Sequence, residues 1–372
     1  MKPSEHERHA SALLSRVAEL IPWMQRRAHQ LDCEAAFPTE ELTALRGAGG
    51  LSMAIPLEED DRETHRCAEE FATLLMRIGE GNLAVGRIME AHFNARHLIA
   101  RFGSASQKCR CRRDVQNGHL FALWVTDAPE NPLRMTRRRD GIQLSGGKAF
   151  CSAAGQATRA LVTAIDASEV PRMLVVALGS GERVRPLESP LQGMRAAVTG
   201  AIDFSGCVVD AEACIGEPGD YLREPDFSTG AWRASAVAAG GLRSLIATMT
   251  THLKAADRLN GPHHLERLGT AIIAYETSRL WVYQAARIVG GANTSPARAV
   301  AYVGLARTAV EAACLDAMRL AQRSLGLAAF RASHPAERIC RDLATYLRQP
   351  APDDVLTEAA ACFSNALVAD CP

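Results

Sequence analysis

The sequence predicts an α+β protein with three consecutive parts: an N-terminal helical domain, a central antiparallel β domain and a C-terminal four-helix bundle. The main observation is a change in the spacing of apolar residues. They recur at the helical period of about 3.6 in residues 1–117, at the strand period of about 2 in 118–222, and again at the helical period in 223–372. The length of 372 residues also favours more than one core.

The N-terminal part is predicted to be helical throughout. An amphipathic helix surrounds Val17, and a shorter helix starts within FPTEELTAL. The shorter helix is expected to stop at Gly47, because the GAGG segment there is typical of a helix C-terminus. Two more helices are expected around 65–78 and 82–102.

The two later parts differ in texture. Residues 118–222 contain short β-like runs separated by Gly and Pro, and the Asp140-Gly141 pair predicts a hairpin turn. The C-terminal part has long helical segments with Ala-rich faces and short breaks, the pattern of an antiparallel four-helix bundle. We expect its helices at approximately 229–257, 264–289, 296–326 and 335–348, with another near the end of the chain.

The charge balance argues against a nucleic-acid partner. Lys and Arg total 42, as do Asp and Glu, so no net field attracts the whole molecule to a polyanion. Basic clusters lie at Lys108–Arg113 and Arg137–Arg139. We interpret both as solvated surface in preference to phosphate-binding sites, which are the alternative.

The cysteines and the hydropathy pattern predict a cytoplasmic protein without a membrane span. The eleven cysteines include no C-x-x-C pair, which argues against a zinc site or a disulfide framework. The N-terminal segment MKPSEHERHA is charged and lacks the apolar core of a signal peptide. No run of about 18 apolar residues is present.

Five segments, in order and at matching spacing, carry a family resemblance. They are FPTEELTALRGAGGLSMAIP, WVTD (Trp124–Asp127), LSGGKAFCS, GMRAAVTGAIDFSGCVV and QRSLGLAAF followed by HPAERICRD. Through them the chain resembles the acyl-CoA dehydrogenase superfamily nearly from end to end. WVTD stands at that family's T-E-P motif, and LSGGKAFCS is similar to its L-x-G-x-K-x-W-I-T motif.

The resemblance implies an FAD enzyme, a homodimer or homotetramer, that acts on an acyl thioester of coenzyme A. In that family the flavin lies between the β domain and the bundle, and a carboxylate removes the α-proton while the β-hydride passes to the flavin. Either an electron-accepting flavoprotein or a flavin reductase is the implied redox partner. A carboxylate kept away from water gains the basicity that this step needs.

The resemblance also implies cofactor-binding positions. Their other interpretation is structural: strand residues for the first four, a solvated helix cap for the arginine, and an exposed Gln and a C-cap Gly for the last two. The positions are Trp124, Thr126, Phe150 and Ser152 beside the flavin ring, Arg258 at the pyrophosphate, and Gln322 and Gly326 reaching the flavin from the partner subunit.

Several positions depart from the family pattern. Pro132 stands where the family has a flavin-binding Ser, and Pro350 stands at the catalytic glutamate. Proline accepts no proton, and the family's second location for the base, here GAWRASAVAAGG, contains no acid. Asp353 is our candidate for a relocated base, although an Asp after a proline is also a helix N-cap signal.

Three functions therefore compete at the level of sequence. The first is an acyl-CoA dehydrogenase-like oxidoreductase acting on the CH–CH group with a non-standard base. The second is a flavin monooxygenase of the same fold, which needs no α-proton base. The third is a catalytically silent scaffold, favoured by the joint loss of several flavin contacts. We rank the first highest because the whole chain follows the family.

Overall fold

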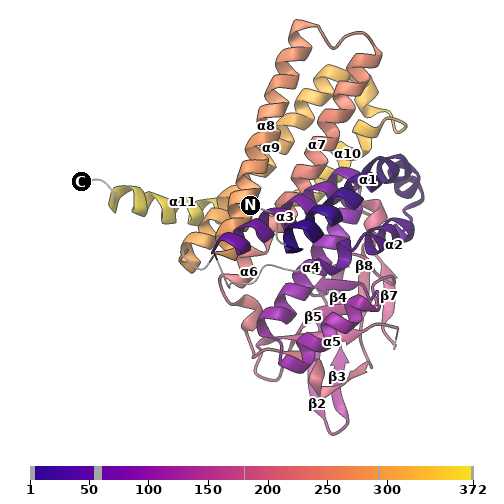
Figure 1. The fold of residues 1–372 in the computed structure, drawn as a ribbon. Helices are drawn as coiled ribbons and strands as arrows, with labels where there is room; N and C mark the ends of the chain where they lie inside the picture. Colours follow the sequence, from indigo (N-terminus) through magenta and orange to yellow (C-terminus); the bar gives the residue numbers. More distant parts are fainter. Residues whose placement is uncertain (1–4, 54–60, 180, 292–293, 370–372) are drawn as a thin grey trace.

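The helix–strand–helix order predicted from the sequence is confirmed by the computed structural model, which describes residues 5–53, 61–179, 181–291 and 294–369 (Figure 1). In Figure 1 the strands and α5 lie at the bottom, and the long helices of the bundle rise above them. The N-terminal helices are α1 (Glu5–Glu34), α2 (Thr39–Gly47), α3 (Asp61–Gly81), α4 (Leu83–Phe102) and α5 (Ala105–Gln116), with a short 3-10 turn η1 (Gly50–Ser52) between α2 and α3.

Helix α5 was not predicted as a separate helix, although its N-terminus carries the sequence pattern of a capping box. Ser104 and Gln107 form a reciprocal capping box, in which each side chain accepts a hydrogen bond from the other residue's backbone N–H. The basic segment Lys108–Arg113 lies on this helix. Arg110 forms an exposed ion pair with Glu212, at 2.6 Å, and thereby links α5 to the central part.

The strands form two sheets in the described part of the chain. The larger sheet has the order β10-β6-β5-β2-β3-β9, with β1 added beside β5, and the smaller has the order β4-β8-β7. The strands are β1 (Phe121–Trp124), β2 (Arg134–Arg138), β3 (Gly141–Ser145), β4 (Gly147–Cys151), β5 (Arg159–Ile165), β6 (Pro171–Ala177), β7 (Arg183–Pro186), β8 (Gly200–Asp203), β9 (Val208–Val209) and β10 (Cys214–Ile215).

The expectation of a wholly antiparallel domain was wrong in one detail. The predicted hairpin at Asp140-Gly141 joins β2 and β3, which are antiparallel. However, β1 and β2 both pair with β5 in the parallel direction. The chain passes through β2, β3 and β4 before it returns as β5, so β5 is not constrained by a tight turn to run against β1. The larger sheet is therefore mixed.

The bundle consists of α7 (Ala231–Ala255), α8 (Pro262–Gly290), α9 (Pro296–Leu325) and α10 (Pro335–Tyr346). The short helix α6 (Asp226–Thr229) precedes it, the 3-10 turn η5 (Gly326–Phe330) follows α9, and α11 (Pro352–Ala369) ends the described chain. In Figure 1, α11 extends to the left, away from the body of the molecule. Its N-terminal half packs on α9, where Gly304 faces Val355 and Ala359.

Close backbone contact joins the N-terminal helices to the bundle. A Cβ added at Gly240 of α7 would lie 2.0 Å from the carbonyl oxygen of Met76, and one at Gly79 of α3 would lie 2.2 Å from that of Val237. Only glycine permits this approach. Because the main apolar core runs through all three parts, their independence as domains with boundaries near 118 and 222 stays a prediction.

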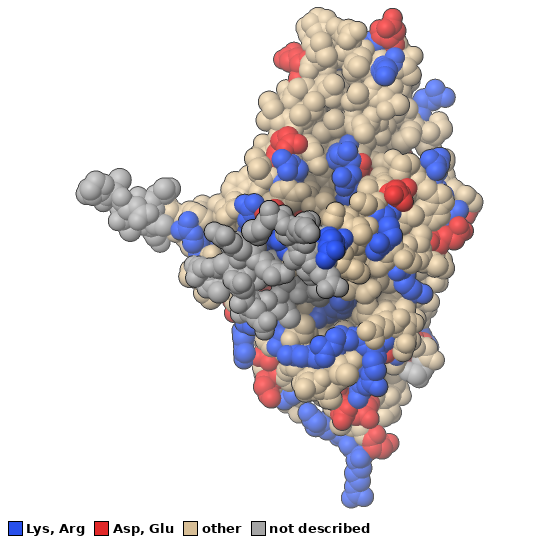
Figure 2. Space-filling model, in the orientation of Figure 1, with Lys and Arg blue, Asp and Glu red and all other residues tan. Residues whose placement is uncertain are grey.

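The surface carries mixed charge. Figure 2 shows basic side chains over the lower part of this face, with acidic side chains among them. This distribution agrees with the net charge of zero and gives no continuous basic stripe on the face that is visible. Among the described residues, no helix is both long enough and apolar enough to cross a membrane.

Candidate active site

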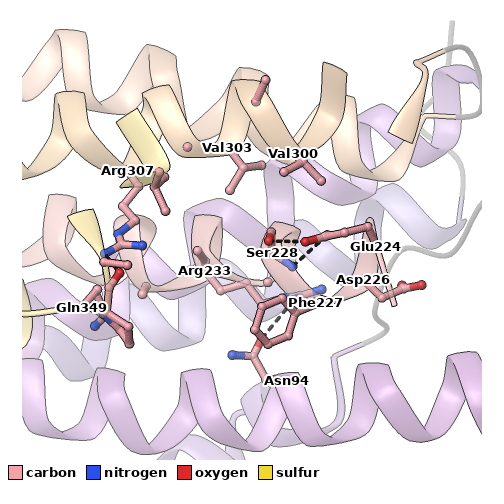
Figure 3. A pocket seen from close by; sticks show the side chains of 18 of the residues that line it. Asn94, Glu224, Asp226, Phe227, Ser228, Arg233, Val300, Val303, Arg307 and Gln349 are labelled. Atoms are coloured by element: carbon pink, nitrogen blue, oxygen red, sulfur yellow. Dashed lines mark hydrogen bonds between the residues drawn. The ribbon is translucent and has the colours of Figure 1, made fainter. Parts of the chain in front are cut away.

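A cavity of about 770 Å³ lies where the three parts of the chain meet (Figure 3). Helix α4, the segment around α6, the first turn of α7, helix α9 and the loop between α10 and α11 enclose it. Much of its wall is apolar, including Leu98, Leu123, Val300 and Val303. A large cavity with an apolar wall and a few convergent polar groups is the usual form of a small-molecule site.

Arg233 of α7 is the most deeply buried cation on the cavity wall, with 3% of its surface exposed. Its Nη1 donates a hydrogen bond to Oδ1 of Asn94 at 2.9 Å, which Figure 3 draws as a dashed line. Burial lowers the pKa of Arg233 to about 10, so the guanidinium is charged at neutral pH. The rings of Phe71 and Trp232 lie beside it.

Glu90 is a buried carboxylate whose two oxygens are both engaged. Arg87 donates to Oε2 in an ion pair, and Nδ2 of Asn94 donates to Oε1. Asn94 therefore bridges Glu90 and Arg233, which form no ion pair with each other.

Asp226 is the second carboxylate with its own partners. His97 Nε2 donates to Oδ1 at 3.2 Å, and Arg101 donates to Oδ2 at 3.2 Å. Burial raises the pKa of Asp226, but the hydrogen bonds from His97 and Arg101 and the charge of Arg101 outweigh it, so the pKa lies below its ordinary value. Burial and then the charge of Arg233 lower the pKa of His97, which keeps this imidazole neutral at neutral pH.

Glu224 lies at the more open side of the cavity. It accepts hydrogen bonds from the backbone N–H of Ser228 at 3.2 Å and from the Ser228 hydroxyl at 2.5 Å. No described cation forms an ion pair with it, in contrast to Glu90 and Asp226. Its carboxylate is exposed and faces the cavity.

The loop between α10 and α11 closes one side of the cavity. Gln349, Pro350 and Ala351 line it, and Nη2 of Arg307 donates to the Pro350 carbonyl oxygen at 2.6 Å. Ala351 has a φ of 47°, a left-handed conformation that costs a non-glycine residue roughly 1 kcal/mol. The position that the resemblance assigns to the catalytic glutamate therefore presents a proline ring and a carbonyl oxygen that is already bonded.

Asp353 lies outside this cavity lining. It is exposed in the first turn of α11, one residue after the first helical residue, Pro352. Because the helix starts at Pro352, Asp353 does not occupy the N-cap position that was its alternative interpretation. A carboxylate in a first helical turn is stabilised by the helix dipole. Its assignment as the base stays a prediction, which this placement does not favour.

Four predicted cofactor positions come together at the adjoining ends of β1 and β4. Trp124 is buried, and its Nε1 donates to the carbonyl oxygen of the buried Ser152 at 2.9 Å. The carbonyl oxygen of the exposed Thr126 accepts from Ala149, and the neighbouring Phe150 has 57% of its surface exposed. The hydroxyl of Thr126 has no hydrogen-bond partner among the described residues.

The other three predicted positions lie at the far end of the bundle. Arg258 is exposed between α7 and α8, where its Nη2 contacts Nε2 of His264 at 3.2 Å. Gln322 is half-buried near the end of α9, and Gly326 is exposed with a φ of 60° at the start of η5. In Figure 1 the junction of α7 and α8 lies at the end of the molecule opposite to the strands, so within one chain these three positions are separated from those at β1 and β4.

Comparison with known proteins places this geometry in a family. No protein-family model matches the chain. It is 27% identical over 346 residues to the mitochondrial short-chain specific acyl-CoA dehydrogenase of Mus musculus, a match that covers 87% of this chain and 81% of that protein. The butyryl-CoA dehydrogenase of Megasphaera elsdenii superimposes with a TM-score of 0.83 over 98% of this chain and 99% of that one, at 16% identity. The chain belongs to the acyl-CoA dehydrogenase superfamily.

One further sequence match and one further structural match were found. The rat counterpart (Rattus norvegicus) is 30% identical over 215 residues, which span 54% of this chain and only 50% of that protein. The FMN-bound TdsC of Paenibacillus sp. A11-2, described elsewhere as a dibenzothiophene monooxygenase, superimposes with a TM-score of 0.84 at 18% identity, over 95% of this chain and 97% of that one. The superfamily fold is therefore shared with both dehydrogenases and a monooxygenase.

Sequence reasoning missed the polar groups inside the cavity of this superfamily member. It considered the segment with Arg233 only for its lack of an acid, and it did not consider Asn94 or His97. One signal was available, because Arg233 is the only charge in an otherwise small and apolar helical segment, GAWRASAVAAGG. Which groups face Arg233 depends on how α4 crosses α7, and the sequence does not state that crossing.

Proposed function

We propose that this chain is an FAD-dependent oxidoreductase that acts on an acyl thioester of coenzyme A. The observation that carries the proposal is the cavity of about 770 Å³, which is closed by the loop where the superfamily places its base and is walled by apolar side chains suited to an acyl group. The cavity reaches Leu123 of β1, the strand that ends at Trp124. The four predicted flavin positions at β1 and β4 do not themselves line this cavity.

The residues at the ends of β1 and β4 fit a flavin ring. Thr126 offers an exposed hydroxyl without a partner, and Phe150 offers an exposed aromatic face beside it. Ser152 is held behind them by Trp124. We propose that these side chains hold FAD, which supplies a hydride acceptor when it is bound.

A second copy of the chain would complete this cofactor site. Arg258 lies in the connection between α7 and α8, and Gln322 and Gly326 lie at the end of α9, whereas Thr126 follows β1. In Figure 1 the junction of α7 and α8 and the strands lie at opposite ends of the molecule. Next to Gly326, Leu327 and Phe330 expose 82% and 60% of their surfaces, as expected for a contact surface that is covered in an oligomer. We therefore propose a homodimer or homotetramer, and we retain the predicted cytoplasmic location and the electron-accepting flavoprotein or flavin reductase as partner.

Glu224 is favoured over Asp353 as the proton acceptor. Both carboxylate oxygens of Glu90 already accept hydrogen bonds, from Arg87 and Asn94. The pKa of Asp226 lies below its ordinary value, which makes Asp226 a weaker base. Glu224 faces the cavity with only Ser228 as a partner, whereas Asp353 does not line the cavity. A base must come within hydrogen-bond reach of the proton that it removes. We retain Asp353 as the second candidate.

A flavin monooxygenase is the second candidate function. It is favoured by the likeness to TdsC and by the absence of a carboxylate from the described loop at Pro350. The silent scaffold is the third, since Pro132 supplies neither a hydroxyl nor a backbone N–H at the expected flavin contact.

One spectroscopic experiment separates the three functions. The purified protein is reconstituted with FAD, and its visible spectrum is followed under anaerobic conditions. Bleaching by an acyl-CoA supports the dehydrogenase. Bleaching only by a flavin reductase with NADH, followed by substrate-dependent oxygen uptake once air is admitted, supports the monooxygenase. The absence of saturable FAD binding at high micromolar concentrations contradicts both enzymes and favours the scaffold.

A further inference from the structure

The cavity contains a buried cation, Arg233, that forms no ion pair with a described residue. Burial lowers the pKa of Arg233, and the charges of Glu90 and Asp226 offset only part of that shift. Arg233 exposes 3% of its surface. Its one hydrogen bond among the described residues is donated to the neutral amide oxygen of Asn94. Its Nε is buried without a partner, and its Nη2 has none among the described residues. An uncompensated buried charge is costly, and proteins normally pair it.

None of the described carboxylates around the cavity forms an ion pair with Arg233. Glu90 is paired with Arg87, and Asp226 is paired with Arg101 and hydrogen-bonded by His97. Glu224 and Glu358 also line the cavity, but both are exposed and neither forms an ion pair with Arg233.

Arg307 is a less suitable anion site than Arg233. It is half-buried, and its Nη2 is already used to hold the Pro350 carbonyl oxygen. Arg233 is instead held in place from behind by the rings of Phe71 and Trp232, and from the side by Asn94. Nη1 is engaged by Asn94 and Nε is buried, so Nη2 is the donor that remains open to a ligand in the cavity.

We propose that the cavity binds an acyl thioester whose acyl chain carries a second carboxylate, and that Arg233 pairs with that carboxylate. The proposal rests on the proposed function for the thioester and on Arg233 for the acid. Guanidinium and carboxylate match in planar, paired hydrogen bonds, and such charge-assisted bonds are among the strongest that proteins make. The apolar wall of Leu98, Val300 and Val303 accommodates the methylene groups between the two ends.

A substitution at Gly230 can test whether Arg233 pairs with a carboxylate of the ligand. A Cβ added there would lie 3.6 Å from Nη1 of Arg233 and 3.7 Å from Oδ1 of Asn94, which are ordinary contact distances. The backbone at Gly230 is right-handed helical, with φ −54° and ψ −25°, so any residue can adopt it. Gly230→Asp therefore brings a carboxylate of the chain itself to Arg233, and Gly230→Ala adds the same Cβ without the charge.

The experiment measures the Kd of acidic and neutral thioesters with the full-length protein in the presence of FAD by calorimetry. Succinyl-, glutaryl- and adipyl-CoA are compared with butyryl-, pentanoyl- and hexanoyl-CoA, which have the same numbers of carbons. We expect one acidic member to bind about tenfold or more tightly than its neutral counterpart. Gly230→Ala is expected to retain this preference, whereas Gly230→Asp and Arg233→Met are expected to abolish it, so that the Kd values of the acidic thioester and its neutral counterpart become equal within about threefold.

The outcomes separate this inference from the proposed function. Equal affinity for acidic and neutral thioesters in the wild type overturns the inference and leaves the proposed function standing. Binding of neither kind of thioester overturns both. If Arg233→Met does not fold, the Gly230 pair decides: a preference that survives Gly230→Asp contradicts the role of Arg233.

Discussion

At the scale of single residues, the cavity wall is organised by which charges are already paired. Glu90 and Asp226 each have a neighbouring arginine, and this leaves Arg233 as an unpaired cation and Glu224 as an unpaired anion. These two side chains come from α7 and from the segment before α6, and they face one cavity. Unpaired charge in a partly dry cavity is where ligand chemistry is expected.

The assignment of the proton acceptor leads to the first prediction. Glu224→Gln keeps the hydrogen-bonding shape but removes the basic oxygen, so we expect it to lower kcat for any flavin-bleaching thioester by about 100-fold or more. Asp353→Asn is expected to change kcat by less than about twofold, since Asp353 is exposed outside the cavity. Stopped-flow reduction of bound flavin provides the measurement. The reverse order of effects identifies Asp353 as the base.

The loop at Pro350 leads to a prediction about the activity of the wild type. We expect little or no α,β-dehydrogenation of simple straight-chain acyl-CoAs, because neither described position of the superfamily's base carries an acid. Rapid turnover of butyryl- or octanoyl-CoA that survives both Glu224→Gln and Asp353→Asn would show that the proton acceptor lies elsewhere.

At the scale of secondary-structure elements, a buried histidine connects α4 to two neighbouring elements. His92 of α4 is fully buried between two other elements: its Nε2 donates to the Leu51 carbonyl oxygen in η1 at 3.0 Å, and its Nδ1 accepts from the backbone N–H of Phe121 in β1 at 3.1 Å. This single imidazole therefore connects the N-terminal helices to the first strand.

The buried imidazole predicts a dependence of stability on pH. Burial, followed by the charge of Arg96, lowers the pKa of His92 to about 3, whereas an unfolded histidine titrates near 6.5. Between these values the unfolded chain binds a proton that the folded chain does not, so the free energy of unfolding falls as the pH falls. We expect a contribution of up to about 1.4 kcal/mol per pH unit below pH 6. Urea unfolding of wild type and His92→Gln, at pH 7 and at pH 5, measures it; equal pH dependence in both refutes the assignment.

The helix contact at Gly240 predicts a strong effect of one methyl group. Because the added Cβ would lie 2.0 Å from the Met76 carbonyl oxygen, Gly240→Ala forces α3 and α7 apart. We expect a loss of about 1–3 kcal/mol in the free energy of unfolding. Gly269→Ala on α8 is the matched control, since nothing lies within 4 Å of its added Cβ. It is expected to stabilise the protein by about 0.5–1 kcal/mol, and denaturant titration of both variants would expose an error in this packing.

At the scale of the whole molecule, the predicted cofactor residues fall into two groups at opposite ends of the folded chain. Trp124, Thr126, Phe150 and Ser152 lie at the strand ends, while Arg258, Gln322 and Gly326 lie at the far end of the bundle. The division is understandable if two copies of the chain meet, so that the bundle end of one copy approaches the strand ends of the other.

Association of two copies gives the last prediction. Leu327→Asp with Phe330→Asp places charge on the exposed apolar surface beside Gly326, and we expect it to convert an oligomer into monomers and to weaken FAD binding by about tenfold or more. Val208→Asp on β9, which is 52% exposed, is the control and is expected to change neither property. Light scattering and FAD fluorescence titration measure both. A wild type that is monomeric but binds FAD tightly would contradict the shared site.

The sequence by itself determined the order of helices and strands, because the apolar period is a local property of the chain. It also determined several helix ends: α2 stops at Gly47, and α9 starts at Pro296 and ends one residue before 326, close to the predicted bounds. The motif segments carried the superfamily resemblance, since they preserve residue types at fixed spacing. They also aligned Pro350 with the position at which the family carries its glutamate, and the structure places Pro350 in the cavity lining.

Only the tertiary structure decided which charges are paired and which face the cavity. Whether Arg233 has a partner depends on Asn94, 139 residues earlier in the chain, and whether Asp226 is a free acid depends on His97 and Arg101. The parallel pairing of β1 with β5 has the same origin, because it joins strands separated by three others. Such contacts are set by how helices cross and sheets close, and no local pattern encodes them: the physical reason is that burial and pairing are properties of neighbours in space, whereas period and capping are properties of neighbours along the chain.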